Sequence, residues 1–178
     1  MQSDEELMSA TARGEMTAFE MLARRHQTSA WNIAFRLLGN ADEAEDVAQE
    51  AFLRILQAAP RYQPTAAFRT YLYRIVTRLC HDHRRKTAPF DGRDPDAETS
   101  PEPSPDEIAV ADEQCHAVRQ ALDALPLQQR TAVILRYYES LRYDEIADVL
   151  GTSRKGVERL LARGKAALAA RLRRFLGK

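Results

Sequence analysis

The clearest chemical pattern in this 178-residue chain lies between Tyr143 and Leu168, in the stretch YDEIADVLGTSRKGVERLLARGKAAL. Gly151 can adopt the left-handed backbone of a tight turn, and Ser153 is a preferred N-cap for a following helix. The stretch therefore predicts a helix-turn-helix, whose second helix presents its first turns to base edges in the major groove of DNA. A helical hairpin with a solvated basic face is the alternative.

The candidate DNA-contacting side chains of this second helix are basic, with one acid among them: Arg154, Lys155, Glu158, Arg159 and Arg163. An arginine can read guanine through two hydrogen bonds, and Glu158 can accept one from cytosine. Arg163 lies later on the helix, where we expect contact with DNA phosphates.

A second basic stretch, residues 61–90, combines arginines with aromatic residues. Its candidate residues are Arg61, Arg69 and Arg74 beside Tyr62, Phe68, Tyr71 and Tyr73. This mixture suits single-stranded nucleic acid, because bases stack on exposed rings while arginines follow the backbone. The loop that contains Pro64 is a candidate pocket for an extruded base. The alternative is that the rings are core residues.

The segment NADEAEDVAQEAFLRIL predicts a helix with an acidic outer face. Asn40 can cap its start, with Glu43 completing a capping box. The outer face carries Glu45, Asp46, Gln49, Glu50 and Arg54. Such a face repels DNA, so the hypothesis is a protein partner with a basic surface, and a solvated face is the alternative. No nucleophile, paired histidine or glycine-rich loop is near these carboxylates, and we predict no enzymatic activity.

The two cysteines, Cys80 and Cys115, each stand next to a histidine. Cysteine and histidine suit zinc, but adjacent helical residues point about 100° apart and the spacing matches no compact zinc motif. Two cysteines also make no disulfide framework. We therefore predict neither a metal site nor a cofactor.

The composition, 44% hydrophobic and 29% charged with only 7 glycines, is typical of a helical globular protein. Apolar residues recur every three or four positions in residues 16–38, 42–56 and 69–86 and again in the C-terminal part of the chain. No apolar run is long enough to span a bilayer, and the acidic N-terminus lacks the apolar segment of a signal peptide. These features predict a cytoplasmic protein without membrane insertion.

A proline-rich acidic segment divides the chain. Residues 87–107 hold five prolines and many acids, a composition that cannot bury enough surface to fold and predicts an extended linker. We predict an all-α fold with two small helical domains, residues 1–86 and 111–178, joined by a flexible linker over residues 87–110.

Three segments, in order, resemble those of bacterial sigma factors of the sigma-70 family, extracytoplasmic-function (ECF) type. DEAEDVAQEAFLRIL is similar to the family's polymerase-binding helix, and FRTYLYRIVTRLCHDHRRK to its promoter-melting and minus-ten helix. The stretch from Ala121 to Leu168 is similar to the minus-thirty-five-binding domain. The resemblance implies a sigma-2-like domain followed by a sigma-4-like domain.

The resemblance also implies a role for each surface. The residues that dock on the clamp helices of the polymerase β′ subunit are Asp46, Gln49 and Glu50. The minus-ten residues, including a loop that captures a flipped non-template base, are Arg61, Tyr62, Phe68, Tyr71, Tyr73, Arg74 and Arg78. The minus-thirty-five residues are Arg154, Lys155, Glu158, Arg159 and Arg163, in a domain that also meets the β flap. The linker threads toward the polymerase active-site and RNA-exit channels, and an anti-sigma factor is a further implied partner.

These implications predict a factor that binds core RNA polymerase and directs it to promoters without a cofactor or a catalytic step of its own. An autonomous helix-turn-helix regulator is the alternative, although it would not need the acidic face, and a metal-binding scaffold is a third possibility. The chain has Tyr71 where the family commonly has Trp, and Arg78 where it has Asn. Its reading helix begins Arg154-Lys155-Gly156-Val157 where Gly-Thr-Val is common. The promoter sequence of relatives therefore does not transfer to this chain.

Overall fold

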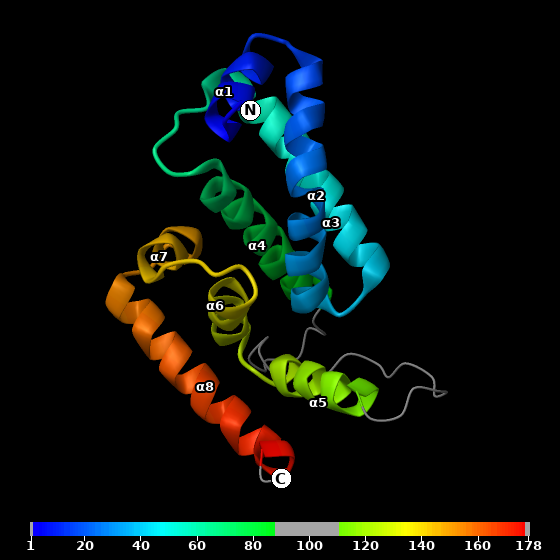
Figure 1. The fold of residues 1–178 in the computed structure, drawn as a ribbon, viewed down its shortest axis with the longest axis vertical. Helices are drawn as coiled ribbons and strands as arrows, with labels where there is room; N and C mark the ends of the chain where they lie inside the picture. The colour runs from blue at the N-terminus through cyan, green and yellow to red at the C-terminus, as the bar shows by residue number, and fades with distance from the viewer. Residues whose placement is uncertain (1, 88–110, 177–178) are drawn as a thin grey trace. The chain divides into compact units, whose positions relative to one another are not determined.

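The computed structural model describes residues 2–87 and 111–176, with side chains placed for residues 2–86 and 116–173. Its elements are α1 (Asp4–Ala12), α2 (Met16–Leu38), α3 (Ala41–Ala58), the 3₁₀ turn η1 (Ala59–Arg61), α4 (Phe68–Thr87), α5 (Ala111–Asp123), α6 (Leu127–Tyr137), α7 (Tyr143–Leu150) and α8 (Arg154–Leu176). All regular structure in the described ranges is helical, and the chain divides into two compact units, Met1–His83 and Arg84–Lys178 (Figure 1). The prediction of an all-α chain with two helical domains is confirmed. The predicted linker lies outside the described residues except for Thr87.

The long helix α2 is the backbone of the N-terminal unit and packs against both α1 and α3. Its apolar residues recur at helical spacing, and Leu22, Ile33 and Leu37 are fully buried. Gly39 ends the helix in the left-handed conformation, with φ 80°, and its amide donates to the Phe35 carbonyl at 2.8 Å. The predicted glycine stop of this helix is confirmed.

The start of α3 is fixed by a cap from Asn40 and by a contact between Glu43 and α4. Asn40 accepts hydrogen bonds from the backbone amides of Asp42, at 2.9 Å, and Glu43, at 3.1 Å, so the predicted N-cap is confirmed. The predicted capping box is not formed, because the Glu43 carboxylate lies instead 3.3 Å from the Nε2 atom of His83 on α4. This pair links the start of α3 to the far end of α4.

The C-terminal unit is built around α6, which packs against both α7 and α8. Arg130 on α6 is 1% exposed, and its Nε donates to the Leu122 carbonyl at 2.8 Å while Nη2 lies 3.0 Å from the Asp123 carboxylate. Burial lowers the pKa of Arg130 to about 10, and the neighbouring Asp123 opposes that shift. The arginine is therefore still charged at neutral pH and ties α6 to the end of α5.

Gly164 on α8 lies directly against α6. A Cβ atom on Gly164 would lie 3.0 Å from the Val133 side chain, tighter than an ordinary van der Waals contact. The small residue therefore lets α8 lie close against α6, which fixes the helix that carries the basic residues.

Candidate functional site

The acidic face predicted on the N-terminal unit lies on the outer side of α3. Asp46 and Gln49 are exposed and Glu50 is half-buried. Gln49 donates to Glu45 at 3.0 Å, and Arg54 donates to Glu50 at 2.7 Å. Asp46 and Gln49 thus face solvent beside a carboxylate that is already paired with an arginine.

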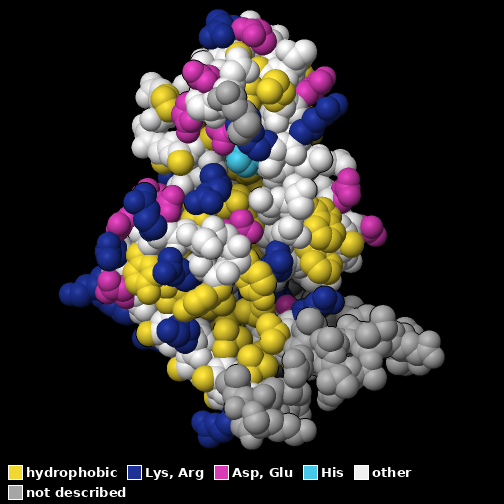
Figure 2. All heavy atoms as spheres, in the orientation of Figure 1, with side chains coloured by type: hydrophobic (Ala, Val, Ile, Leu, Met, Phe, Trp, Pro, Cys, Tyr) yellow, Lys and Arg dark blue, Asp and Glu magenta, His cyan; other side chains and the backbone are white. Residues whose placement is uncertain are grey.

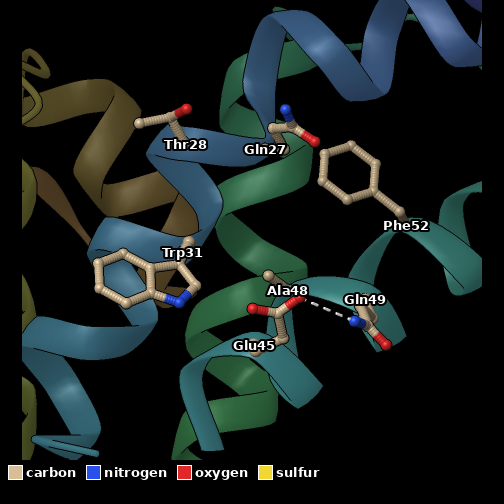
Figure 3. Close-up of a pocket in the computed structure, with 7 residues that line it drawn as sticks. All are labelled: Gln27, Thr28, Trp31, Glu45, Ala48, Gln49 and Phe52. Atoms are coloured by element: carbon tan, nitrogen blue, oxygen red, sulfur yellow. Dashed lines mark hydrogen bonds between the residues drawn. The ribbon is translucent and has the colours of Figure 1, made fainter. Parts of the chain in front are cut away.

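A pocket of about 360 Å³ lies between α2 and α3 directly beside this face. Its lining residues are Gln27, Thr28, Trp31, Glu45, Ala48, Gln49 and Phe52. Figure 3 shows Trp31 extending from α2, with the hydrogen-bonded Glu45 and Gln49 on α3. Aromatic rings together with a carboxylate and amides on the walls suit a protein side chain that has both an apolar stem and a polar or basic end.

Sequence reasoning identified the α3 side of this pocket but missed the α2 side. Trp31 is the only tryptophan of the chain and is stacked on Phe35, with ring centroids 4.9 Å apart. The available sequence signal was that Trp31 falls outside the apolar stripe of residues 16–38. A large aromatic residue on the polar side of an amphipathic helix indicates a contact surface.

The aromatic and basic residues of the predicted minus-ten surface separate into two groups. Arg61, Arg74 and Arg78 are exposed, and Tyr62 and Tyr71 are half-buried with ring centroids 5.2 Å apart. Tyr71, Arg74 and Arg78 are spaced by three and four residues, so they lie along one face of α4. These five residues form a continuous candidate surface with the η1 turn, which we call the Tyr62–Arg78 surface.

Phe68 and Tyr73 are a correction to the predicted contact set. Each is 1% exposed, and the Phe68 ring packs 5.2 Å from the His26 ring. A ring must expose a face before a base can stack on it, so both belong to the core of the N-terminal unit. The alternative stated from the sequence, that the rings are core residues, therefore holds for Phe68 and Tyr73.

Burial alters the chemistry of the two remaining tyrosines. It is the largest cause that raises the pKa of Tyr62 and of Tyr71, and the nearby Glu5 carboxylate raises the pKa of Tyr62 further. The Tyr62 hydroxyl oxygen is buried and has no hydrogen-bond partner among the described residues. Burial of the hydroxyl oxygen disfavours the charged phenolate and keeps Tyr62 neutral at physiological pH.

The predicted helix-turn-helix is present as α7, a turn and α8. Gly151 has φ 63° and ψ 37°, and the Gly156 amide donates to the Ser153 side chain at 3.1 Å, which confirms the predicted turn and cap. Ile146 and Val157 are fully buried between the two helices, and Leu161 is 2% exposed. The packing fixes α8 so that its first turns project outward.

The basic residues of α8 differ in what holds them. Lys155, Arg159 and Arg163 are exposed, and the two arginines line a pocket of about 220 Å³. Arg154 lies 3.1 Å from Asp144 and 3.6 Å from Glu158, with its guanidinium 5.8 Å from the centre of the Tyr143 ring. Figure 2 shows Lys and Arg side chains gathered over the start of α8 and the neighbouring α7, with Asp and Glu among them. The predicted base reader Arg154 is thus already bound by two carboxylates.

The described residues offer no cluster of metal ligands and no membrane-spanning helix. Within residues 2–87 and 111–176, no three His, Cys, Asp or Glu residues lie together as a metal site would require. Cys80 is buried, and the side chain of Cys115 is outside the described set. None of the described helices combines the length and apolar character needed to cross a bilayer.

The fold and these surfaces define a helical DNA-binding protein with a helix-turn-helix in its C-terminal unit. Residues 22–89 match the family description Sigma-70 region 2, and residues 115–168 match Sigma-70, region 4. The chain is 31% identical over 163 residues to the RNA polymerase sigma-H factor of Pseudomonas aeruginosa, covering 84% of this chain and 83% of that one. It is also 31% identical over 172 residues to the ECF RNA polymerase sigma factor SigW of Bacillus subtilis, covering 90% and 92%.

Among solved structures, that of CnrH in complex with the cytosolic domain of CnrY is similar with a TM-score of 0.74 and 26% identity, covering 96% of this chain and 97% of that one. The chain belongs to the sigma-70 family of RNA polymerase sigma factors, in the ECF group. The family resemblance seen in the sequence is confirmed. Its relatives act in transcription initiation and are not themselves enzymes.

Proposed function

We propose that this protein binds core RNA polymerase through the α3 face and the adjoining α2–α3 pocket, and directs the enzyme to a subset of promoters. The observation that carries the proposal is the pocket, because exposed Glu45 and Gln49 of the α3 face line an aromatic cavity on a chain whose other unit holds a helix-turn-helix. A protein that only bound DNA would gain nothing from an acidic face with an apolar cavity beside it.

We call the α3 face together with the α2–α3 pocket the docking surface. The partner that fits it is a helical, basic segment of the polymerase, which we identify with the clamp helices of the β′ subunit. Carboxylates at Asp46 and Glu45 complement basic side chains of such a segment, and Trp31 can accept the stem or the guanidinium of an arginine. The β flap is the proposed second contact, made by the C-terminal unit.

For DNA, we propose that the Tyr62–Arg78 surface binds the opened non-template strand at the minus-ten element and that the start of α8 reads the minus-thirty-five element. Half-exposed tyrosines between arginines suit stacked bases and a phosphate backbone. The free energy of binding the opened strand drives melting, so no cofactor and no catalytic step is assigned to this chain. Lys155 and Arg159 are the proposed base readers, with Arg163 on phosphates.

An anti-sigma factor is the proposed regulatory partner, since the similar protein CnrH is known in complex with CnrY. We place it on the same docking surface, where it would compete with polymerase. Core polymerase and promoter DNA are cytoplasmic, and we propose that compartment for this protein.

The test is transcription of genomic fragments by core polymerase, with and without this protein. New start sites that depend on the protein are expected. Asp46→Lys with Glu50→Lys should weaken polymerase binding at least tenfold, because charges at a desolvated interface are reversed. Glu15→Lys makes the same charge change as each of these single substitutions, on an exposed residue outside the α3 face, and should leave binding unchanged. A protein that controls promoters without binding core polymerase would instead be an autonomous regulator.

A further inference from the structure

The short N-terminal helix α1 lies outside the residues that match the sigma-70 regions, which begin at residue 22. Its buried apolar residues, which pack the helix against α2, are Leu7, Met8 and Ala10. Its first turn carries three acids, Asp4, Glu5 and Glu6. Acidic residues stabilise a helix N-terminus through the helix dipole. Asp4 and Glu5 in addition contact residues that are distant in sequence, on α2 and α4.

Asp4 anchors the first turn of α1 to α2. Its carboxylate lies 2.7 Å from the Nε2 atom of His26 and also pairs with the Arg25 guanidinium. His26 is 8% exposed and its ring packs against Phe68, the first residue of α4. A paired carboxylate in this partly buried position holds the turn in one place, since leaving either partner unpaired would be costly.

Glu5 reaches the start of α4 from the same turn. Its Oε1 atom accepts the backbone N–H of Phe68 at 3.3 Å, across 63 positions of sequence. The first amides of a helix have no partner within the helix, so Glu5 acts as a cap supplied from another element. The same helix packs against η1, which ends at Arg61.

The loop between Arg61 and Phe68 is therefore in contact with α1 at both ends. At its start, α1 packs against η1, and at its end, Glu5 accepts from the Phe68 amide. Tyr62, which follows η1, is near enough for Glu5 and Asp4 to influence its ionisation. Its ring lies 5.2 Å, centroid to centroid, from the Tyr71 ring on α4, so the loop is also fixed to the outer face of that helix. A loop closed at both ends by one rigid helix has fewer conformations to lose when it binds a ligand.

We propose that the first turn of α1 is a clasp that holds the Arg61–Phe68 loop in shape to receive an extruded base, with Glu5 as the positioning residue. This inference rests on the proposed binding of the opened strand and extends it to an element outside the matched regions. Glu5 acts through the backbone of Phe68 and does not touch the nucleic acid. Its negative charge alone would oppose DNA binding, so the clasp and simple charge repulsion predict opposite effects of its removal.

The test uses the full chain with core polymerase and a promoter fragment obtained from the transcription assay, with permanganate reactivity of unpaired thymines as the measure of strand opening. Glu5→Ala removes the acceptor and should lower the opening equilibrium roughly fivefold, the effect of losing a helix cap. Glu5→Asp keeps the charge but shortens the reach and should show a similar loss. Glu5→Gln keeps an oxygen acceptor without the charge and should open the promoter as well as the unchanged protein.

Glu6→Gln is the matched charge control, because Glu6 lies in the same turn and is exposed, and glutamine keeps an oxygen that can accept from the Ser3 amide, as Glu6 does at 2.8 Å in the capping box of α1. This control should leave promoter opening unchanged. All of the variants should leave the affinity for core polymerase unchanged. The clasp is overturned if Glu5→Ala opens the promoter equally well or better, or if Glu5→Gln loses as much as Glu5→Ala. If Glu5→Ala does not fold, the Asp and Gln variants decide between the same outcomes. Failure of the unchanged protein to bind polymerase or open any promoter would refute the proposed function instead.

Discussion

Neutralising Asp144 should strengthen promoter binding, because this carboxylate pairs with Arg154 and competes with DNA for its guanidinium. Arg154 Nη1 lies 3.1 Å from Asp144, and the two side chains are 62% and 68% exposed. An exposed pair of this kind is worth about 0.2–1 kcal/mol, so releasing it should raise affinity roughly 1.4- to 5-fold if Arg154 then contacts DNA. Asp144→Asn keeps the size of the side chain and removes only the charge.

The assay is fluorescence anisotropy of a labelled minus-thirty-five duplex with the full chain in complex with core polymerase, over a range of salt concentrations. If the released Arg154 neutralises one phosphate, the slope of log K against log salt becomes steeper by about 0.9. If it reads a base, affinity rises at particular positions of the duplex and the slope changes less.

A double-mutant cycle separates this mechanism from general electrostatics. Asp144→Asn in an Arg154→Ala background should have little effect, since the arginine that it releases is absent. Asp148→Asn removes the same charge four residues later on α7 and serves as the matched control. The reasoning is refuted if Asp144→Asn leaves affinity unchanged, or if its effect is as large without Arg154.

Three further outcomes are expected. Arg159→Ala should cost roughly 1–3 kcal/mol of binding at particular promoter positions if Arg159 reads a base, whereas a uniform loss across duplex sequences would indicate a phosphate contact. Arg130→Ala should lower the free energy of unfolding of the C-terminal unit by about 1–3 kcal/mol, since the Leu122 carbonyl and the Asp123 carboxylate would lose their partner, and urea denaturation followed by circular dichroism measures it. The pKa of Tyr62 is raised in the folded state above its ordinary value of 10.0. The neutral phenol therefore contributes its full stabilisation below pH 10, and this stabilisation is lost as the pH rises through the folded-state pKa. Tyr62→Phe should therefore lose less stability than the unchanged protein in alkaline thermal melts, and an equal loss would contradict the buried position of the hydroxyl.

Local features of the fold could be predicted because each depends on residues only a few positions apart. Gly39 ends α2, Asn40 begins α3, and Gly151 and Ser153 make the turn of the helix-turn-helix, as the sequence indicated. These features reflect backbone geometry and hydrogen bonds within one helical turn, and that geometry is the same wherever the segment is placed.

Which face of a helix is buried depended on partners elsewhere in the chain. Tyr73 lies two residues from Tyr71 on α4, and sequence alone could assign either ring to DNA. In the structure Tyr73 is buried and Tyr71 is half-exposed, because the other helices of the N-terminal unit cover one side of α4 only. The alternation of aromatic residues does not identify the covered side.

The sequence by itself determined the family, the helices other than α1, the caps at Gly39, Asn40 and Ser153, and the charge of each surface. Tertiary structure decided which charges are available: Arg154 is held by Asp144 from the preceding helix, and Glu5 caps a helix that begins 63 positions later. It also formed the α2–α3 pocket by bringing Trp31 and Phe52 to one cavity. The physical reason is that helix formation is governed by contacts within one or two turns, whereas a pocket, a long-range cap or an ion pair between helices exists only after apolar faces have packed.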